Sequence, residues 1–171
     1  MSHIQSFLPV SNADAKVLIL GSMPGKKSLE QNQYYAHPSN AFWKIMGELV
    51  GAKADIPYEQ RLQLLKSSGI ALWDVLATCE RDTSLDSHIR KESANDFASF
   101  FVLHPHITQV FFNGSKAEQC FIKFVQNTQP LPPLKYCRLP STSPAHAGMR
   151  YADKLQAWRT AIAMHRTKAD R

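Results

Sequence analysis

The chain has 171 residues, of which 44% are hydrophobic, and a formal net charge of +6 at pH 7. This composition excludes a disordered chain, the length is enough for one domain with a sizeable core, and no apolar stretch approaches the ~18 residues that a membrane span needs. The positive charge favours an anionic partner, of which nucleic acid is the first candidate. The alternative is a basic soluble protein whose charge has no specific partner.

Residues 1–15 lack a basic segment followed by an apolar one, so we expect no secretory signal. The three cysteines, Cys79, Cys120 and Cys137, are odd in number and have neither metal nor redox spacing. Both observations favour a protein of the reducing cytoplasm.

Four apolar runs of strand length alternate with helical patterns along the chain. The predicted strands lie near 16–21, 69–75, 108–113 and 135–140. Because these runs are continuous, we expect helices to cover both faces of the sheet. The alternation predicts an α/β fold, a three-layer sandwich in which helices flank a central four-stranded parallel sheet.

The helical patterns cover 41–50, about 55–69, a segment capped by Ser93, a segment with a capping box at Ser115 and Glu118, and 151–164. The longest irregular stretch runs from Thr78 to Lys91, and long loops in compact domains are usually functional. Residues 165–171 form a basic tail that we expect to be frayed. We therefore predict one domain over 1–171, with a core of about 16–164.

Two polar loops each follow a predicted strand. One has the sequence GSMPG at 21–25 and continues as YAHPSNAFW at 35–43, and the other is LPSTSPAHA at 139–147. Both are dense in residues that fix backbone direction and offer hydrogen-bonding groups. Ligands bind at the carboxyl ends of strands in an open parallel sheet, so we expect both loops to face one cleft.

The loops do not fit several simpler enzymes. GSMPG is not a nucleophile elbow, because Ser22 stands one position early. The phosphate-binding patterns GxxxxGK[ST] and GxGxxG are missing, so we expect no nucleotide cofactor, and no cluster predicts a metal. The remaining polar groups lack a strong nucleophile and suit cleavage of an N-glycosidic bond, in which the protein stabilises a departing base and positions water. These groups are His37, Asn40, Asp74, Ser141, Ser143 and His146.

On these motifs the chain resembles the uracil-DNA glycosylase superfamily, and most closely its hypoxanthine-DNA (deoxyinosine) glycosylase branch. The resemblance spans roughly Val17 to Ile162: 21–25 is similar to the first motif, 37–43 to a His-Pro-x-Asn-x-Phe-Trp segment shared with the mismatch-specific uracil/thymine branch, and 139–145 to the second motif. It implies a monofunctional DNA glycosylase that releases hypoxanthine from deoxyinosine in base-excision repair. The expected partner is DNA containing deaminated bases, without a membrane or a cofactor, and the expected enzyme is a monomer.

Three alternatives remain open at this stage. The enzyme could instead act on uracil or on a broad set of deaminated bases. The chain could also be a non-catalytic module that binds damaged DNA, or a small-molecule phosphate-binding α/β protein.

One departure from the family concerns the catalytic water. Many relatives place a water-activating Asn or Asp third in the first motif, where this chain has Met23. A thioether cannot activate water, and the resemblance assigns this role to Asn40. Asn40 could instead only cap the helix predicted from Ala41, although the two roles are compatible.

The resemblance also implies a set of base-binding residues. Tyr35 would stack on the flipped base, or would be a packed loop anchor. Asp74, when ionised, can only accept, which suits the N1–H of hypoxanthine, or it would end its strand and bond loop amides. Ser22, Met23, His37 and Asn113 complete the predicted set.

Contacts to the DNA backbone are expected at the rim of the cleft. Lys26 lies beside the first motif, and Arg81 and Ser84 lie in the 78–91 stretch, which resembles an insertion of this branch. We expect these three residues to contact phosphates.

The second motif resembles the loop that enters the duplex when a base is extruded. Ser141 and Ser143 would bind flanking phosphates, and His146 would bond a phosphate or the leaving base, or be solvated. Pro144 and Ala145 occupy the tip. Alanine is too small to fill the space that a flipped base leaves in the stack. We therefore expect the enzyme to flip matched bases weakly and to rely on damaged or mispaired bases, whose extrusion costs less free energy.

Overall fold

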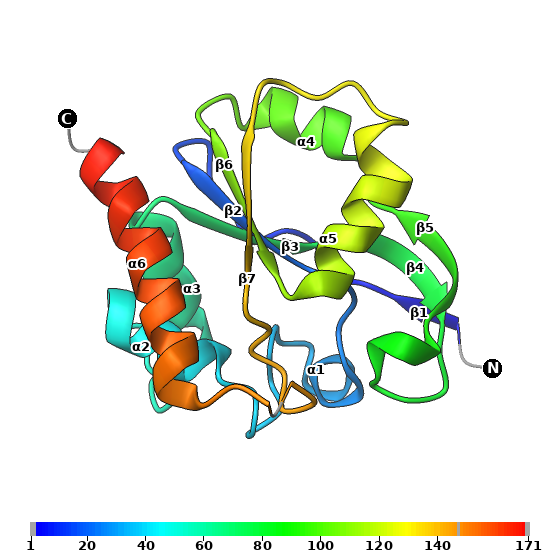
Figure 1. The fold of residues 1–171 in the computed structure, drawn as a ribbon, viewed down its shortest axis with the longest axis horizontal. Coiled ribbons are helices and arrows are strands. Elements are labelled where there is room, and N and C mark those ends of the chain that lie inside the picture. The colour runs from blue at the N-terminus through cyan, green and yellow to red at the C-terminus, as the bar shows by residue number, and fades with distance from the viewer. Residues whose placement is uncertain (1–2, 147, 170–171) are drawn as a thin grey trace.

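A parallel sheet of four strands lies at the centre of the fold, in the order β3-β2-β6-β7 (Figure 1). The structure, a computed structural model, describes residues 3–146 and 148–169. The strands are β2 (Val17–Gly21), β3 (Ile70–Asp74), β6 (Gln109–Asn113) and β7 (Lys135–Leu139). They confirm the four strands predicted from the apolar runs.

Helices cover both faces of this sheet, which confirms the three-layer sandwich (Figure 1). One layer contains α2 (Phe42–Val50), α3 (Tyr58–Ser67) and α6 (Tyr151–Ala169), and the other contains α4 (Phe97–Leu103) and α5 (Ser115–Phe121), which a π-helical turn, η2 (Ile122–Gln126), continues. The short α1 (Lys26–Gln31) follows the first motif. Within the described residues, no helix is both long and apolar enough to cross a membrane.

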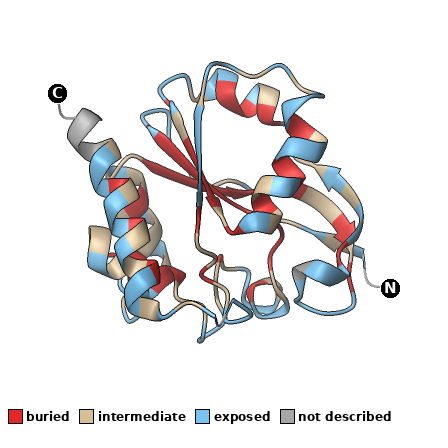
Figure 2. Cartoon of the chain, in the orientation of Figure 1, coloured by how far each residue is buried: buried red, intermediate tan, exposed pale blue. Residues whose placement is uncertain are grey.

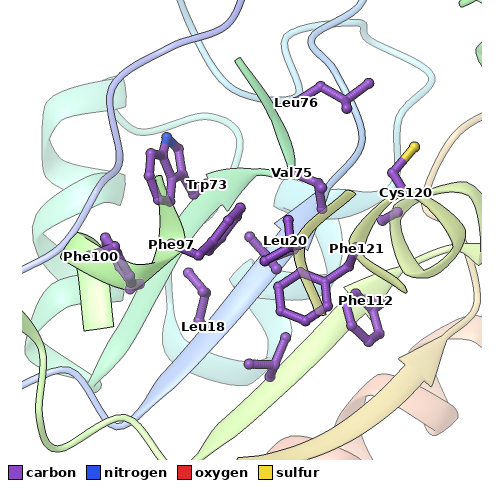
Figure 3. Packing of buried hydrophobic residues seen from close by; sticks show 14 of the residues in the cluster. Leu18, Leu20, Trp73, Val75, Leu76, Phe97, Phe100, Phe112, Cys120 and Phe121 are labelled. Atoms are coloured by element: carbon purple, nitrogen blue, oxygen red, sulfur yellow. The ribbon is translucent and has the colours of Figure 1, made fainter. Parts of the chain in front are cut away.

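The central strand β2 explains why its sequence is a continuous apolar run. Leu18 and Leu20 pack in the cluster that holds α4 and α5, whereas Val17 and Ile19 pack in the cluster that holds α2 and α6. Every residue of β2 is buried, and in Figure 2 the inner strands of the sheet are mostly red, whereas the edge strand β7 is mostly pale blue. Figure 3 shows the first of the two clusters. Both faces of the strand therefore require apolar side chains.

The prediction of an irregular stretch from Thr78 to Lys91 is wrong. β4 (Leu76–Glu80) pairs antiparallel with β1 (His3–Gln5) and with β5 (Arg90–Ala94), forming a second sheet in the order β1-β4-β5. A single helical turn, η1 (Asp86–His88), lies between β4 and β5. Two register shifts interrupt the β4–β5 pairing, and β5 is mostly polar, so neither strand shows the alternation that reveals a half-buried strand.

Two predicted helix caps are also wrong. Ser93 lies in β5, and α4 is capped by Asp96, whose Oδ1 accepts from the Ser99 N–H at 3.0 Å. At α5 the capping position belongs to Gly114, and no side chain caps the helix. The predicted box residue Glu118 instead pairs with Arg138 at 3.6 Å.

The two ends of the described chain differ from the prediction as well. Helix α6 continues to Ala169, so the tail expected to be frayed from 165 is helical as far as the structure describes it, and residues 170–171 lie outside the described residues. Upstream, β1 precedes the predicted start of the core at 16.

The strand pairing aligns the carboxyl ends of all four parallel strands. Gly21 pairs with Asp74, and Asn113 pairs with Leu139. Leu20 pairs with Phe112, so the next residues along β2 and β6 are Gly21 and Asn113. The segments that leave these ends are the first motif, the residues after Asp74 and Asn113, and the second motif, which therefore start at one edge of the sheet.

Candidate active site

A cavity of about 490 Å³, here called the base cavity, lies at this edge. All the predicted site residues except Arg81 line it, and every one of them lies in the described part of the chain. The expectation that both polar loops face one cleft is therefore confirmed. The lining members are Ser22, Met23, Lys26, Tyr35, His37, Asn40, Asp74, Ser84, Asn113, Ser141, Ser143, Pro144, Ala145 and His146.

A wider groove of about 1030 Å³ lies beside the base cavity. The two share a wall that includes Tyr35, His37 and Asn40, together with the second motif. The groove lacks the ends of β2, β3 and β6, where four of the predicted base-binding residues lie: Ser22, Met23, Asp74 and Asn113. We therefore assign the chemistry to the base cavity.

Arg81 is not available for the predicted phosphate contact. Its side chain is only 2% exposed and donates a hydrogen bond to the carbonyl oxygen of Pro24. Arg81 thus supports the first motif from inside the fold. The prediction from its charge is wrong because sequence does not reveal which way a side chain at a strand end points.

Asn40 both bonds the start of α2 and lines the base cavity. Its Oδ1 accepts from the N–H of Phe42, the first residue of α2, at 3.0 Å. The helix begins one residue later than predicted, so its capping position is Ala41 and not Asn40. The half-buried side chain of Asn40 also lines the base cavity. A carboxamide oxygen has a second lone pair and the amide nitrogen has two hydrogens, so the bond to Phe42 leaves bonding capacity toward the cavity.

His37 lies on the same turn as Asn40. Its Nδ1 accepts from the Ser39 N–H at 3.0 Å, and its carbonyl accepts from the Asn40 N–H at 2.9 Å. The neutral ring must therefore carry its proton on Nε2. His37 is exposed at the cavity wall and can present that N–H as a donor.

Tyr35 and Asp74 converge beside Gly21, at the end of β2. A Cβ added to Gly21 would lie 2.5 Å from Asp74 Oδ1 and 2.8 Å from Tyr35 Oη, which only glycine avoids. Asp74 is buried, yet it lines the base cavity. The glycine of the first motif thus makes room for a carboxylate and a phenol at the cavity floor.

Tyr35 has an unusual backbone conformation and a packed ring. Its φ of 54° is left-handed, a strained conformation for an aromatic residue, and its ring stacks on Phe42 at 4.2 Å between centroids. The packing agrees with the loop-anchor alternative, while the position in the cavity lining still suits contact with a base.

Its neighbour Tyr34 adds to the support of this loop. The Tyr34 hydroxyl donates to the Leu8 carbonyl at 2.8 Å, and its own carbonyl accepts from the Trp43 indole N–H at 2.8 Å. Burial first, and then the charge of Asp74, raise the pKa of the Tyr34 hydroxyl far above its ordinary value.

Asn113 holds the second motif rather than standing free in the cavity. Its Oδ1 accepts from the Thr142 N–H at 2.9 Å, and its Nδ2 donates to Thr142 Oγ1 at 3.0 Å. The next residue, Gly114, has a φ of 93°, and a Cβ there would lie 2.9 Å from Ser141 Cβ. The end of β6 is therefore fitted closely to the loop after β7.

Thr142 is a site residue that the sequence reasoning missed. It is 1% exposed, and besides its bonds to Asn113 its carbonyl accepts from the Ala41 N–H at 3.0 Å. Thr142 thereby joins the second motif both to β6 and to the segment that carries Asn40. No sequence signal separates it from the neighbouring hydroxyl residues.

Lys154 and Trp158 of α6 support the second motif from behind and were also missed. Lys154 Nζ donates to the His146 carbonyl at 2.8 Å, and the Trp158 indole N–H donates to the Pro140 carbonyl at 2.9 Å. Burial lowers the pKa of the Lys154 ammonium. The helical pattern identifies Trp158 only as core, and a lysine is normally read as solvated.

The rim of the cavity carries exposed groups that suit contact with DNA. Lys26 is exposed, and its backbone N–H donates to Ser84 Oγ at 2.7 Å. In the second motif, the Ser143 N–H donates to Ser141 Oγ at 3.2 Å, and each hydroxyl still carries its own O–H donor.

The tip of the second motif is exposed from Pro144 to His146. The Ala145 N–H donates to Ser143 Oγ at 3.2 Å, and the His146 N–H donates to the Ser143 carbonyl at 3.0 Å. The tip is therefore a folded turn. Among the described residues, no group of three or more His, Cys, Asp or Glu side chains could hold a metal ion.

The chain is similar to several known proteins. A family model described as the uracil DNA glycosylase superfamily matches residues 8–164. A hypoxanthine DNA glycosylase of Methanosarcina barkeri is 40% identical over 114 residues, which cover 66% of this chain and 72% of that protein. A protein of the same name from Methanosarcina acetivorans is 39% identical, with the same coverage.

One solved structure extends the likeness to nearly the whole fold. The solution NMR structure of a candidate uracil DNA glycosylase from Methanosarcina acetivorans has a TM-score of 0.80 against this chain. The two are 30% identical, and the match covers 96% of this chain and 99% of the other.

Proposed function

The chain belongs to the uracil DNA glycosylase superfamily, and on that premise we propose that it is a monofunctional DNA glycosylase that releases hypoxanthine from deoxyinosine in DNA. The curated relatives named hypoxanthine DNA glycosylases support this substrate. The observation that carries the proposal is the base cavity, which Asn40, Asp74 and Met23 of the first motif all line.

In the proposed mechanism, Asn40 orients the hydrolytic water. The Phe42 N–H fixes Asn40 Oδ1, and the remaining bonding capacity of the carboxamide holds the water against C1′ of the flipped nucleoside. A carboxamide is too weak a base to deprotonate water. It suffices because the sugar becomes oxocarbenium-like as the C–N bond breaks, and such a cation accepts a neutral water that then loses its proton to solvent.

Asp74 supplies the base preference in this scheme. An ionised carboxylate only accepts, so it pairs with the N1–H of hypoxanthine. In uracil the corresponding N3–H lies between two carbonyl oxygens, whereas the N1–H of hypoxanthine has a carbonyl on one side only, so uracil would place a second oxygen against the carboxylate. The Nε2–H of His37 offers a donor to an acceptor on the departing base, and the ring of Tyr35 offers a surface for stacking.

The remaining cavity residues are assigned to DNA and to support. Ser141, Ser143 and Lys26 are proposed to bind phosphates on either side of the flipped nucleotide. Asn113 is proposed to keep the second motif in place through Thr142.

The reaction is proposed to stop at hydrolysis of the base. The motif segments 21–25, 37–43 and 139–147 contain no lysine that could form a Schiff base with the sugar. We propose that the enzyme acts as a cytoplasmic monomer, for which its three cysteines suit a reducing compartment.

Replacement of Asn40 tests the mechanism. Both Asn40→Ala and Asn40→Ser should lower single-turnover excision from an inosine duplex by about a hundredfold or more, because neither holds the water with a carboxamide. Ser keeps an acceptor for the Phe42 N–H, so the Ser variant would keep its activity if only the loss of this bond mattered. Strand cleavage by alkali at the abasic product gives the rate, and thermal unfolding monitors the fold.

Asn12→Ala is the matched control, since Asn12 Oδ1 makes a comparable local bond to the Asp14 N–H at 3.1 Å outside the cavity. It should excise at the wild-type rate. Full activity of both Asn40 variants would remove Asn40 from the mechanism.

A panel of duplexes containing inosine, uracil or xanthine tests the substrate. Faster release of hypoxanthine than of uracil is expected. Equal release would instead assign a broad deaminated-base glycosylase, and binding to inosine DNA without an abasic product would assign a non-catalytic module.

A further inference from the structure

One large apolar side chain in the lining of the base cavity is exposed. Leu85 is 45% exposed and belongs to the cavity lining. The other large apolar side chains that are exposed among the described residues lie outside that lining: Leu8, Val102, Leu103, Ile122, Tyr136 and Met164. A single exposed leucine is ordinary on a protein surface. Leu85, however, lies where a ligand of the base cavity can contact it.

The backbone on either side of Leu85 is held in place. The Leu85 N–H donates to Thr83 Oγ1 at 3.1 Å, and the Leu85 carbonyl accepts from the His88 N–H at 3.1 Å. Thr83 Oγ1 and His88 Nδ1 lie 2.7 Å apart and share a hydrogen bond. Leu85 thus projects from a closed turn between β4 and β5.

This turn is tied to the first motif. Ser84 Oγ accepts from the Lys26 N–H at 2.7 Å, and Arg81 donates to the Pro24 carbonyl. Ser87 lines the base cavity together with Leu85. In Figure 1 the η1 turn and the second motif lie on either side of α1, so that the base cavity has a rim contributed by each.

The tip of the second motif offers little to fill a vacated base stack. Ala145 carries one methyl group and Pro144 a small ring, and both are exposed. Proteins that distort a duplex insert apolar side chains between base steps, and enzymes that flip a nucleotide must offset the lost stacking. Leu85 has the size and the apolar surface that such an insertion needs.

We propose that Leu85 is a wedge that enters the duplex beside the flipped deoxyinosine and holds the stack open. This role rests on the proposed glycosylase function and makes Leu85 a positioning residue, since it contacts neighbouring bases and not the reacting atoms. The rigid turn keeps the side chain exposed before DNA binds, and the duplex buries it afterwards.

The test compares a paired lesion with an unpaired one. In one duplex deoxyinosine is opposite cytosine, and in the other it is opposite a tetrahydrofuran abasic analogue, which removes the pairing partner. Leu85→Ala should lower single-turnover excision about tenfold on the paired duplex and less than about twofold on the unpaired one. Leu85→Met should restore most of the rate.

Fluorescence of 2-aminopurine next to the lesion gives a second readout. Binding of the wild-type protein should raise this fluorescence by unstacking the probe, and Leu85→Ala should lose the rise. Leu103→Ala is the matched control, because Leu103 is 69% exposed on α4 outside the base cavity. It should behave as wild type in both measurements.

Three results would overturn the wedge: full excision of the paired lesion by Leu85→Ala, an equal loss on both duplexes, or a selective loss in Pro144→Ala with Leu85→Ala unaffected. Release of hypoxanthine from the unpaired duplex by the wild type establishes the glycosylase independently of Leu85. If the wild type released none from either duplex, the proposed function would fail, and the wedge with it.

Discussion

At the scale of single residues, the tightest constraint in the site is the missing side chain of Gly21. A Cβ there would lie 2.5 Å from Asp74 Oδ1, closer than non-bonded atoms approach, so the carboxylate would have to move. Gly21→Ala should therefore lower inosine excision about tenfold or more and destabilise the fold by roughly 1–3 kcal/mol, the usual cost of overpacking.

Single-turnover excision and urea denaturation measure the two effects. The matched control is Gly148→Ala, because a Cβ at Gly148 would meet nothing within 4 Å. Unchanged excision by Gly21→Ala would mean that the position of Asp74 does not matter for the reaction.

The charge of Asp74 is separable from its size. Asp74→Asn keeps the shape but replaces one acceptor oxygen by a donor NH₂, which would face the N1–H of hypoxanthine. The ratio of inosine to uracil excision should fall about tenfold, because specificity built on a hydrogen bond is lost when the bond is lost. Competition between the two duplexes measures the ratio directly, and an unchanged ratio would exclude Asp74 as the base-reading group.

At the scale of elements, three parts of the fold hold the second motif. The end of β6 binds it through Asn113, the segment before α2 binds it at Thr142, and α6 binds it through Lys154 and Trp158. The loop that follows β7 is therefore a rigid rim. Rigid placement suits a site that must position water and base within a few tenths of an ångström.

Gly114→Ala tests the fit between β6 and this loop. Gly114 and Gly51 both have a positive φ, 93° and 80°, so alanine should cost about 1 kcal/mol of backbone strain at either. Only at Gly114 would the new Cβ also meet Ser141, at 2.9 Å, whereas at Gly51 it would meet nothing within 4 Å.

Denaturant unfolding should therefore show a larger loss of stability for Gly114→Ala, and excision should fall only in that variant. Equal loss of stability in the two variants would show that the contact with Ser141 adds nothing to the backbone strain.

At the scale of the whole molecule, we expect the net charge of +6 to favour DNA binding through the lysines that line the base cavity. DNA affinity should fall linearly on a log–log plot against salt concentration, since each neutralised phosphate releases condensed counterions. Lys26→Ala should reduce the steepness of that line by about 0.9, the contribution of one phosphate contact.

Fluorescence anisotropy of an inosine duplex over a range of KCl concentrations gives the slope. Lys123→Ala removes the same charge from an exposed position outside the base cavity, so its slope should match that of the wild type. A steepness unaltered by Lys26→Ala would withdraw the phosphate contact proposed for that residue.

The features that the sequence determined by itself are those with a local signal. Continuous apolar runs identify strands buried on both faces, and loops rich in Gly, Pro and Ser after those runs mark the site, because parallel strands end at a common edge. From these signals the central sheet, the layers and nearly all of the base cavity follow.

Only the tertiary structure decided how residues distant in sequence meet. The hydrogen bond of Lys26 with Ser84 spans 58 positions, and that of Asn113 with Thr142 spans 29. No local sequence signal identifies such pairs. The inward direction of the Arg81 side chain, the linking role of Thr142 and the second sheet therefore could not be predicted. A side chain's direction is set by the packing of its neighbours, and that packing exists only once the chain has folded.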